Sequence, residues 1–255
     1  MGLKEKALAG EKLDDVLIID ADAHYMVEYL PNFDDYIQRM DRVGIDKLFC
    51  STMGNLDFQK SYPDRILSMY RYRDLSPDHE LQKKDLMKWL DNPGTIGFGE
   101  VWPNGAGYPC NGDWYQTMWE VADSCKTVVM NHTWYPNLYC DPAMYAEIAE
   151  QYTNAQIVLV HSGGSVEGML RAVKLVNKYD NVYMELNSTS HHYKEIEYLA
   201  KHANNDKVLY GSDFASEDFA SQLGPIVFAQ ISEEIKAKFL GLNAKALLEK
   251  IGRYR

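Results

Sequence analysis

The stretch VLIIDADAH, residues 16–24, sets four apolar residues directly before three alternating polar ones. An uninterrupted apolar run is typical of a strand buried on both faces, as in parallel sheets. Asp20, Asp22 and His24 follow at intervals of two residues. Because side chains alternate along a strand, we expect Asp22 and His24 to share a face, with Asp20 one layer below them. The stretch predicts a buried strand over residues 16–20 that leads into one half of a metal site.

Seven further apolar runs, most of them rich in β-branched or aromatic residues, predict strands along the rest of the chain. They cover residues 46–52, 66–72, 95–101, 127–133, 156–162, 181–187 and 207–213. Amphipathic segments typical of helices cover residues 36–44, 81–94, 113–125, 142–152, 166–179, 192–203 and 232–251. The connection between the second and third strands predicts a loop or a short helix.

Strands that recur at intervals of roughly 20–32 residues match the size of a β-α-β step. Eight such steps without a linker predict an α/β fold, a single-domain (β/α)8 TIM barrel over residues 1–255, in which residues 1–14 form a polar N-terminal extension. An open doubly wound sheet is the alternative. It normally carries a glycine-rich phosphate loop after its first strand, and DADAHYM, residues 20–26, is not such a loop.

The acidic composition argues against nucleic acid as a partner. The formal net charge is −11 at pH 7, whereas binding to a phosphate backbone requires a basic surface. No apolar run approaches the roughly 18 residues of a membrane span, and the N-terminal residues lack the apolar core of a signal peptide. We therefore expect a cytoplasmic protein whose partner is a small-molecule substrate, with no nucleic acid and no membrane.

Polar residues interrupt the apolar runs near the carboxyl ends of several predicted strands. In a TIM barrel the active site lies at these ends, where inward-pointing side chains converge. A divalent ion requires several rigidly held nitrogen or oxygen ligands, which imidazole and carboxylate groups supply. The sequence predicts that six side chains converge there: Asp22, His24, Glu100, His132, His161 and Asp213.

Five motifs, taken in order, carry a resemblance to a known family. They are IIDADAH (18–24), VVMNHTW (128–134), IVLVHSGG (157–164), VLYGSDFAS (208–216) and FLGLNAKALL (239–248). Together they resemble the amidohydrolase superfamily, in particular its amidohydrolase-related branch of metal-dependent TIM-barrel proteins. That branch contains hydrolases and also nonoxidative decarboxylases such as aminocarboxymuconate semialdehyde decarboxylase.

The resemblance implies a metal site and assigns roles within it. Asp22, His24, His132 and Asp213 correspond to the metal ligands, and His161 to a further ligand or to a general acid/base. Asp22 stands where the family usually has a histidine. Some decarboxylases of the branch also carry a carboxylate at this position, and the change makes the site more anionic. Zn²⁺ is the expected ion and Mn²⁺ stays open. Because family members are often dimers, a homodimer is one assembly that the resemblance allows.

Glu100 adds a second question about the metal. It resembles the bridging or metal-binding glutamate of the two-metal, TatD-type deoxyribonucleases in the same superfamily. A structural ion pair is an equally good interpretation of this residue. The sequence therefore leaves open whether the site binds one divalent ion or two.

The leading functional hypothesis is a metal-dependent hydrolase that cleaves a small ester, lactone or amide through a metal-activated water. Asp213 would act as the general base, and His161 would stabilise the developing oxyanion. The alternative is a metal-dependent nonoxidative decarboxylase of a small aromatic or unsaturated carboxylic acid. A third interpretation, from another class, is a metal-binding or ligand-sensing protein without catalysis.

Four residues outside the ligand set are candidates for substrate binding. Arg71 and Arg73 lie two residues apart, and inward-pointing guanidinium groups would suit a substrate carboxylate. Outward ion pairs are the alternative for both. Trp102 and Trp134 follow the fourth and fifth predicted strands and would suit the wall of an aromatic pocket, with ordinary packing as the alternative.

Overall fold

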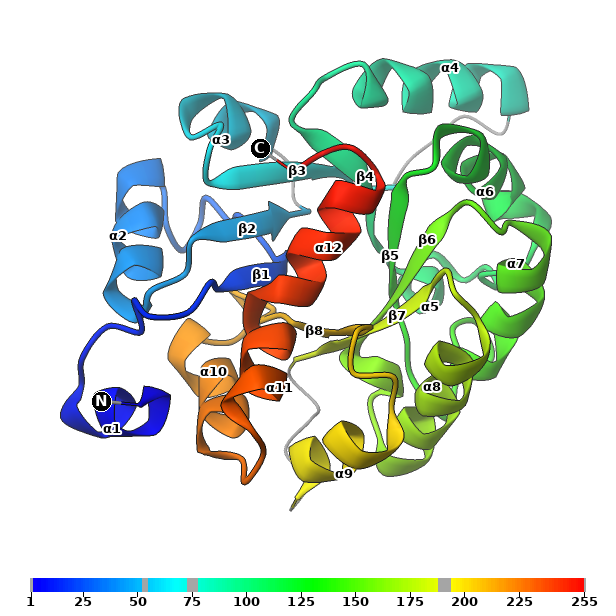
Figure 1. Cartoon of the computed structure of the whole chain (residues 1–255). Coiled ribbons are helices and arrows are strands. Elements are labelled where there is room, and N and C mark those ends of the chain that lie inside the picture. Colours follow the sequence, from blue (N-terminus) through cyan, green and yellow to red (C-terminus); the bar gives the residue numbers. More distant parts are fainter. Residues whose placement is uncertain (1, 52–54, 73–77, 188–193, 255) are drawn as a thin grey trace.

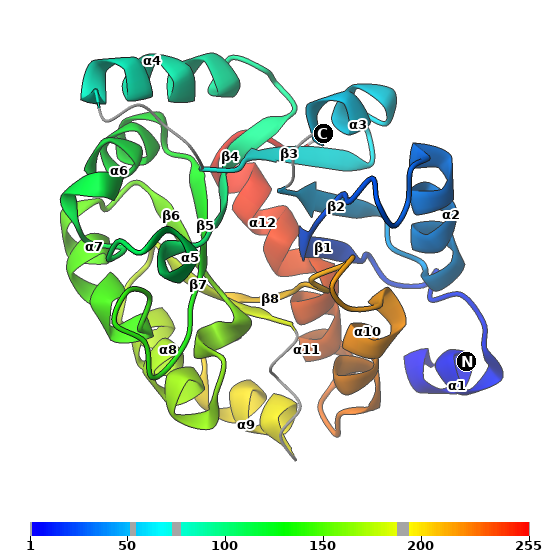
Figure 2. The same cartoon turned by 180° about the vertical axis from the view of Figure 1, so that it is seen from behind.

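Eight parallel strands form a barrel in the computed structural model, which describes residues 2–51, 55–72, 78–187 and 194–254 (Figures 1 and 2). Each strand pairs with the next one along the chain. An isolated parallel bridge joins Ala23, at the end of the first strand, to Phe214, beyond the end of the last strand, so the barrel is nearly closed. The predicted (β/α)8 TIM barrel is confirmed. Its strands are β1 (Ile19–Ala23), β2 (Lys47–Cys50), β3 (Ile66–Tyr70), β4 (Thr95–Val101), β5 (Val128–His132), β6 (Gln156–Val160), β7 (Val182–Leu186) and β8 (Val208–Tyr210).

Helices surround the barrel, as the ribbon in Figure 1 shows. Most of them lie where the apolar periodicity predicts a helix, and the short α3 occupies the connection between β2 and β3. The α-helices are α1 (Leu3–Ala9), α2 (Phe33–Val43), α3 (Asn55–Ser61), α4 (His79–Leu90), α5 (Pro103–Ala106), α6 (Asp113–Cys125), α7 (Tyr145–Gln151), α8 (Val166–Lys178), α9 (Glu195–His202), α10 (Phe219–Phe228), α11 (Glu233–Ala237) and α12 (Asn243–Lys250).

Several helical segments differ from the predictions. The helix predicted over residues 142–152 begins as a 3₁₀ turn, η1 (Pro142–Met144), and the one predicted over 232–251 is divided by a π-helical turn, η3 (Lys238–Leu242). The sequence did not predict α1, which lies in the expected polar extension, nor the short α5, nor α10, which contains Pro225 in its interior. A proline normally ends a helix because it removes a backbone donor and clashes with the preceding turn. Within the described residues, no helix has the length and apolar character that crossing a membrane would require.

The first strand begins three residues later than the sequence predicts. Asp20 and Asp22 therefore lie inside β1 and are almost fully buried, at 0% and 1% exposure. The pairing of β1 with β2 shifts register between Asp20 and Ala23. Donors from neighbouring strand ends make this burial tolerable, because Ser212 after β8 donates to the Asp20 carboxylate and the Asn187 side chain after β7 donates to Asp22 Oδ2. The Ser212 and Asp213 amides also donate to the backbone carbonyl of Asp22 over 3.1 and 2.9 Å.

The barrel interior is apolar and continues into the last helix. Ile19 and Phe49 belong to the same buried cluster as Leu247 and Leu248 of α12. Figure 1 shows α12 lying across the barrel opening, and Figure 2 shows it behind the strands. Since side chains of α12 pack into the barrel, this helix closes one end and leaves the carboxyl ends of the strands for the polar residues.

We expect Leu248→Ala to lower the free energy of unfolding by about 2–5 kcal/mol, because it removes a fully buried side chain from this closure. Chemical denaturation followed by circular dichroism would measure the change. Leu242→Ala, at a position 44% exposed in the adjoining turn, is the matched control and should cost far less. Equal losses in the two variants would contradict the role assigned to α12.

Candidate metal centre

Six acidic and histidine side chains gather at the carboxyl ends of the strands in two neighbouring groups. Within each group the potential ligand atoms all lie within 4.8 Å of one another. The structure thus brings together every metal-ligand candidate that the sequence supplied. The first group is Asp22, His24 and Asp213, and the second is Glu100, His132 and His161.

The first group joins the ends of β1 and β8. His24 Nε2 lies 3.0 Å from Asp213 Oδ1. On the other side of the ring, His24 Nδ1 lies 2.9 Å from the hydroxyl of Ser51. Because Ser51 engages Nδ1, Nε2 is the nitrogen that faces the acidic residues, which is how a second contact commonly orients a metal-binding histidine.

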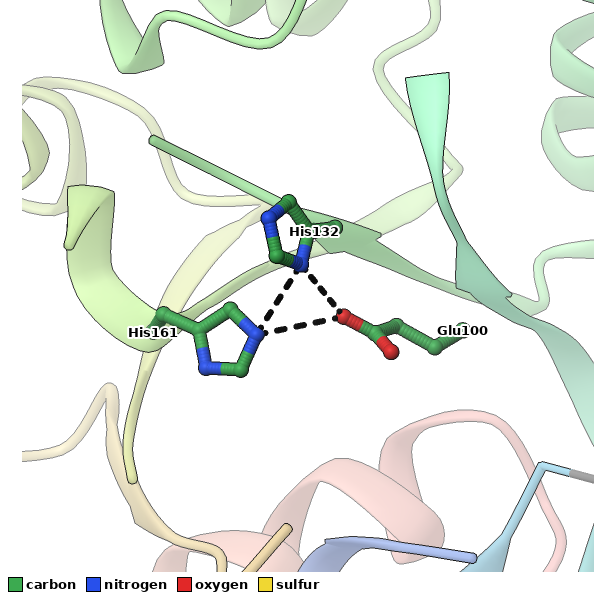
Figure 3. A group of neighbouring side chains, drawn as sticks. All are labelled: Glu100, His132 and His161. Atoms are coloured by element: carbon green, nitrogen blue, oxygen red, sulfur yellow. Dashed lines mark hydrogen bonds and ion pairs between the residues drawn. The ribbon is translucent and has the colours of Figure 1, made fainter. Parts of the chain in front are cut away.

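The second group joins the ends of β4, β5 and β6 (Figure 3). Glu100 Oε1 lies 3.0 Å from His132 Nδ1 and 3.4 Å from His161 Nε2. The two histidine nitrogens lie 3.0 Å apart. Three donor atoms at these mutual distances converge on one small volume, as Figure 3 shows.

Glu100 connects the two groups. Its Oε1 faces His132 and His161, whereas its Oε2 lies 3.5 Å from His24 Nε2. A carboxylate with one oxygen toward each group can serve two ions as a bridge, or can accept hydrogen bonds from the histidines around one ion. The geometry is compatible with both alternatives that the sequence left open.

A chain of hydrogen bonds fixes the ring of His161. The side-chain amide nitrogen Nδ2 of Asn187 donates to Asp22 Oδ2 over 2.7 Å. That orientation turns the Asn187 oxygen toward His161 Nδ1, and the two atoms are hydrogen-bonded. His161 therefore donates from Nδ1 and directs Nε2 toward Glu100 and His132. Asn187 was not among the residues singled out from the sequence.

Asp20 supports the site from below. Its carboxylate accepts the Ser212 hydroxyl over 2.5 Å and the amides of Ser212 and Asp22 over 3.0 and 3.1 Å. Both oxygens of Asp20 accept hydrogen bonds from these donors, and Asp20 belongs to neither ligand group. It ties the end of β8 to β1 next to Asp213. Burial, the largest influence, raises the pKa of Asp20 to about 7, although the hydrogen bond from Ser212 opposes it.

Glu185 is a further buried carboxylate that the sequence analysis missed. It lies in β7 with no exposed surface, and its Oε2 accepts the backbone amide of His161 over 3.1 Å. No hydrogen-bond partner reaches Oε1 among the described residues. A glutamate within the apolar run NVYMELN, residues 181–187, was the available signal, because a charge inside a doubly buried strand needs an explanation.

The histidine after β6 sits on an unusual backbone. His161 and Ser162 have φ values of 62° and 47°, the left-handed region that non-glycine residues rarely adopt. Such a conformation costs on the order of 1–3 kcal/mol per residue and persists only where the surroundings enforce it. Here the Ser162 hydroxyl donates to the Glu185 carbonyl over 2.7 Å, and the Gly163 amide donates to the Thr133 hydroxyl over 2.8 Å.

The histidines and carboxylates perturb one another strongly. Burial lowers the pKa of His24, but the hydrogen bond to Asp213 and the charge of Asp22 outweigh it and raise that pKa to about 9. Burial also lowers the pKa of His161, but the hydrogen bond to Glu100 and the charge of Glu100 outweigh it and raise that pKa to about 9. Burial, followed by the charge of Glu100, raises the pKa of Asp22 well above its usual range.

The donor set fits a divalent cation. It consists of imidazole nitrogens and carboxylate oxygens, the ligands that Zn²⁺ and Mn²⁺ accept. Asp22 Oδ1 is buried and has no hydrogen-bond partner among the described residues. A buried carboxylate oxygen without a donor is costly, and a cation at the centre of the groups would compensate it. The ligand roles themselves stay a prediction.

The predicted substrate-binding residues have different positions. Trp134 stacks over His132 with ring centroids 6.0 Å apart and planes at 5°. Trp102 lies 6.3 Å from the same ring at 65°. Both tryptophans are partly exposed, at 37% and 43%. Arg71 follows β3 and belongs to neither ligand group, and Arg73 lies outside the described residues.

A cavity of about 600 Å³ lies elsewhere among the described residues. Its walls come from α2 and from the start of α10, including Arg39, Arg42 and Asp218. None of the six candidate ligands lines it. We therefore identify the site by its converging donor atoms rather than by cavity size.

Comparisons with known proteins agree with this fold. The family model described as amidohydrolase matches residues 63–250. The match begins after β2 and so includes the strand ends that carry Glu100, His132, His161 and Asp213 but not Asp22 or His24. No curated protein matches the sequence.

Several solved structures share the architecture. A 5-carboxyvanillate decarboxylase from Novosphingobium aromaticivorans, complexed with manganese and 4-hydroxy-3-methoxy-5-nitrobenzoic acid, is 14% identical with a TM-score of 0.68, over 93% of this chain and 99% of that one. A dihydroxybenzoic acid decarboxylase from Polaromonas, with manganese and 2-nitroresorcinol, is 15% identical with a TM-score of 0.64, over 92% and 97%. An uncharacterised TIM-barrel protein from Bordetella bronchiseptica is 15% identical with a TM-score of 0.75, over 93% and 100%. Identities this low establish the fold alone.

We expect the purified protein, after reconstitution with Mn²⁺ or Zn²⁺, to hold at least one ion per chain. The double variant Asp22→Ala/His24→Ala should lose it, because it removes two of the converging donors. Elemental mass spectrometry of both proteins would measure this, with His79→Ala as the control, since His79 contacts Thr117 outside both groups.

The stoichiometry separates the two interpretations of Glu100. Two ions in the wild type and one in Glu100→Gln would make Glu100 a ligand of a second ion. One ion in both proteins would leave it as a hydrogen-bond acceptor. A reconstituted wild type without any ion would refute the metal site altogether.

Proposed function

Since the chain belongs to the amidohydrolase family, we propose that it is a metal-dependent nonoxidative decarboxylase of a small aromatic or unsaturated carboxylic acid. The observation that carries the proposal is the fixed imidazole of His161. Its Nδ1 is held by Asn187, and its Nε2 faces the cluster of candidate ligands. A decarboxylase needs such a proton donor beside the group that binds the substrate carboxylate.

The similarity to manganese-containing aromatic acid decarboxylases supports decarboxylation over the hydrolysis that was the leading hypothesis from the sequence. Hydrolysis stays the second candidate, because Asp213 presents a carboxylate, bonded to His24, that could deprotonate a water. The two reactions share fold and donor set, so only the products separate them.

Asp22, His24, His132 and Asp213 would hold the ion, with Glu100 as a fifth donor or as the link to a second one. When bound, a divalent ion supplies a Lewis acid that anchors the substrate carboxylate and draws electron density toward it. Three carboxylates in the donor set favour an oxygen-preferring ion, so we include Mn²⁺ beside the Zn²⁺ expected from the sequence.

His161 performs the proton transfer in this proposal. The bond between the carboxylate carbon and the ring or vinyl carbon breaks, its electron pair stays on that carbon, and CO₂ leaves. His161 Nε2 then delivers a proton to the carbon. Each turnover converts the carboxylate and one proton into CO₂ and the product with hydrogen in place of the carboxylate, and His161 regains its proton from solvent. No water is added to the product and no oxidant is needed.

Two flanking tryptophans suit such a substrate. Trp102 and Trp134 both contact the His132 ring and have partly exposed rings. Aromatic faces of this kind bind planar rings by offset or edge-to-face packing. Arg71 and Arg73 stay candidates for a second substrate carboxylate, as the sequence predicted.

We expect the metal-loaded protein to release CO₂ from members of a panel of hydroxylated benzoic acids. His161→Asn should lower kcat by about 10²–10⁴-fold, because it removes the general acid, while metal content stays at the wild-type level. Mass spectrometry of the products, with carboxyl-labelled substrates, would measure both the release and its rate.

A parallel panel of esters, lactones and amides tests the competing reaction. Turnover of this panel alone, abolished in Asp213→Asn, would refute decarboxylation in favour of the hydrolase. Binding of the acids without turnover of either panel, in a fully metal-loaded sample, would refute catalysis and favour a ligand-sensing protein.

A further inference from the structure

We propose that Glu185 is a positioning residue that holds the proton donor His161 in place, an inference that rests on the proposed decarboxylase function. Glu185 lies in β7, beside β6, and is fully buried. It contacts the turn after β6 at two points. Its carboxylate Oε2 accepts the His161 amide over 3.1 Å, and its backbone carbonyl accepts the Ser162 hydroxyl over 2.7 Å.

These contacts stabilise a backbone conformation that is unfavourable by itself. His161 and Ser162 both have left-handed φ values, and a β-strand followed by two such residues turns sharply. By accepting the His161 amide, the Glu185 carboxylate fixes the position of the His161 backbone, from which the imidazole extends. Asn187, two residues further along the same chain segment, fixes where the ring points. Residues at the end of β7 thus fix both the backbone position of His161 and the orientation of its imidazole ring.

The barrel also makes room for this carboxylate. A Cβ at Gly211, in the segment after β8, would lie 2.1 Å from Glu185 Oε1 and 2.6 Å from its carboxyl carbon. Any residue other than glycine at position 211 would displace the Glu185 carboxylate from its observed position. One oxygen of this buried carboxylate, Oε2, accepts a backbone amide, and the other, Oε1, occupies the space beside Gly211 without a hydrogen-bond partner among the described residues. Because burying a carboxylate is costly, a glutamate at this position needs a role that outweighs the cost, and the contact with His161 supplies one.

The inference predicts a loss in kcat rather than in binding. Glu185→Leu removes the acceptor, so kcat for CO₂ release should fall by about 10²-fold, the typical cost of misplacing a catalytic group by about 1 Å. KM and metal content should stay near wild type. Glu185→Gln keeps an oxygen that can accept the His161 amide and should recover most of the lost rate.

Two controls separate positioning from a general effect on the fold. Gln156→Leu removes another buried polar side chain, at the start of β6, and should leave kcat unchanged. Gly211→Ala displaces the carboxylate without deleting it and should reproduce the loss seen in Glu185→Leu. Thermal unfolding of each variant identifies any that fails to fold.

A double-mutant cycle tests whether Glu185 works through His161. In a His161→Asn background, Glu185→Leu should cause no further loss of kcat, because there is no donor left to misplace. Fully additive losses, or a Glu185→Leu variant with the wild-type kcat, would overturn the inference.

A measurement without turnover keeps this inference separate from the proposed function. The ring nitrogen NMR signals of His161 should shift in Glu185→Leu and return toward their wild-type positions in Glu185→Gln. If no acid is decarboxylated but these signals behave as stated, the proposed function fails and the positioning role stands. Unchanged signals in Glu185→Leu would refute the positioning role whatever the substrate.

Discussion

The burial of several carboxylates at one end of a closed barrel is the constraint on which the rest of this structure depends. Asp20, Asp22 and Glu185 are at most 1% exposed, and Glu100 and Asp213 lie close by with little exposed surface. Removing a carboxylate from water is costly unless donors or cations surround it. Hydroxyls, amides and imidazoles from the ends of β1, β5, β6, β7 and β8 supply most of those donors. Two oxygens, on Asp22 and Glu185, stay without one among the described residues, and the excess of negative charge favours a bound cation.

The same constraint explains features of the backbone that look unfavourable by themselves. The left-handed residues His161, Ser162 and Asp213 occur where a strand must turn its next side chain toward the carboxylates. Strain of this kind is tolerated because the apolar barrel below and α12 at the opposite end supply the stability. At the carboxyl ends of the strands, the arrangement of charged side chains thus outweighs the local backbone preference of individual residues.

Sequence periodicity was a good guide to the regular parts of the chain. The eight strands occur in the predicted order, and α6 has the predicted bounds of residues 113–125, since its apolar stripe and following left-handed Lys126 define it locally. Where tertiary contacts compete with local signals, prediction was poorer. Pro225 in its interior argued against predicting α10. Strand β1 begins three residues later than predicted because Ser212 after β8 and Asn187 after β7 satisfy the buried carboxylates of Asp20 and Asp22.

By itself, the sequence determined the barrel and the six polar side chains that meet at one end, because side chains alternate along each strand and the carboxyl ends of parallel strands meet at one end of a barrel. The family followed from five motifs in order and from the family model, and not from these periodicities. Only the tertiary structure decided how those side chains divide into two groups around Glu100. It alone revealed that Asn187 and Glu185 hold His161, and that Gly211 leaves the space for Glu185. These relations join residues from different strands, and no spacing along the chain encodes the distance between two atoms brought together by closure of the barrel.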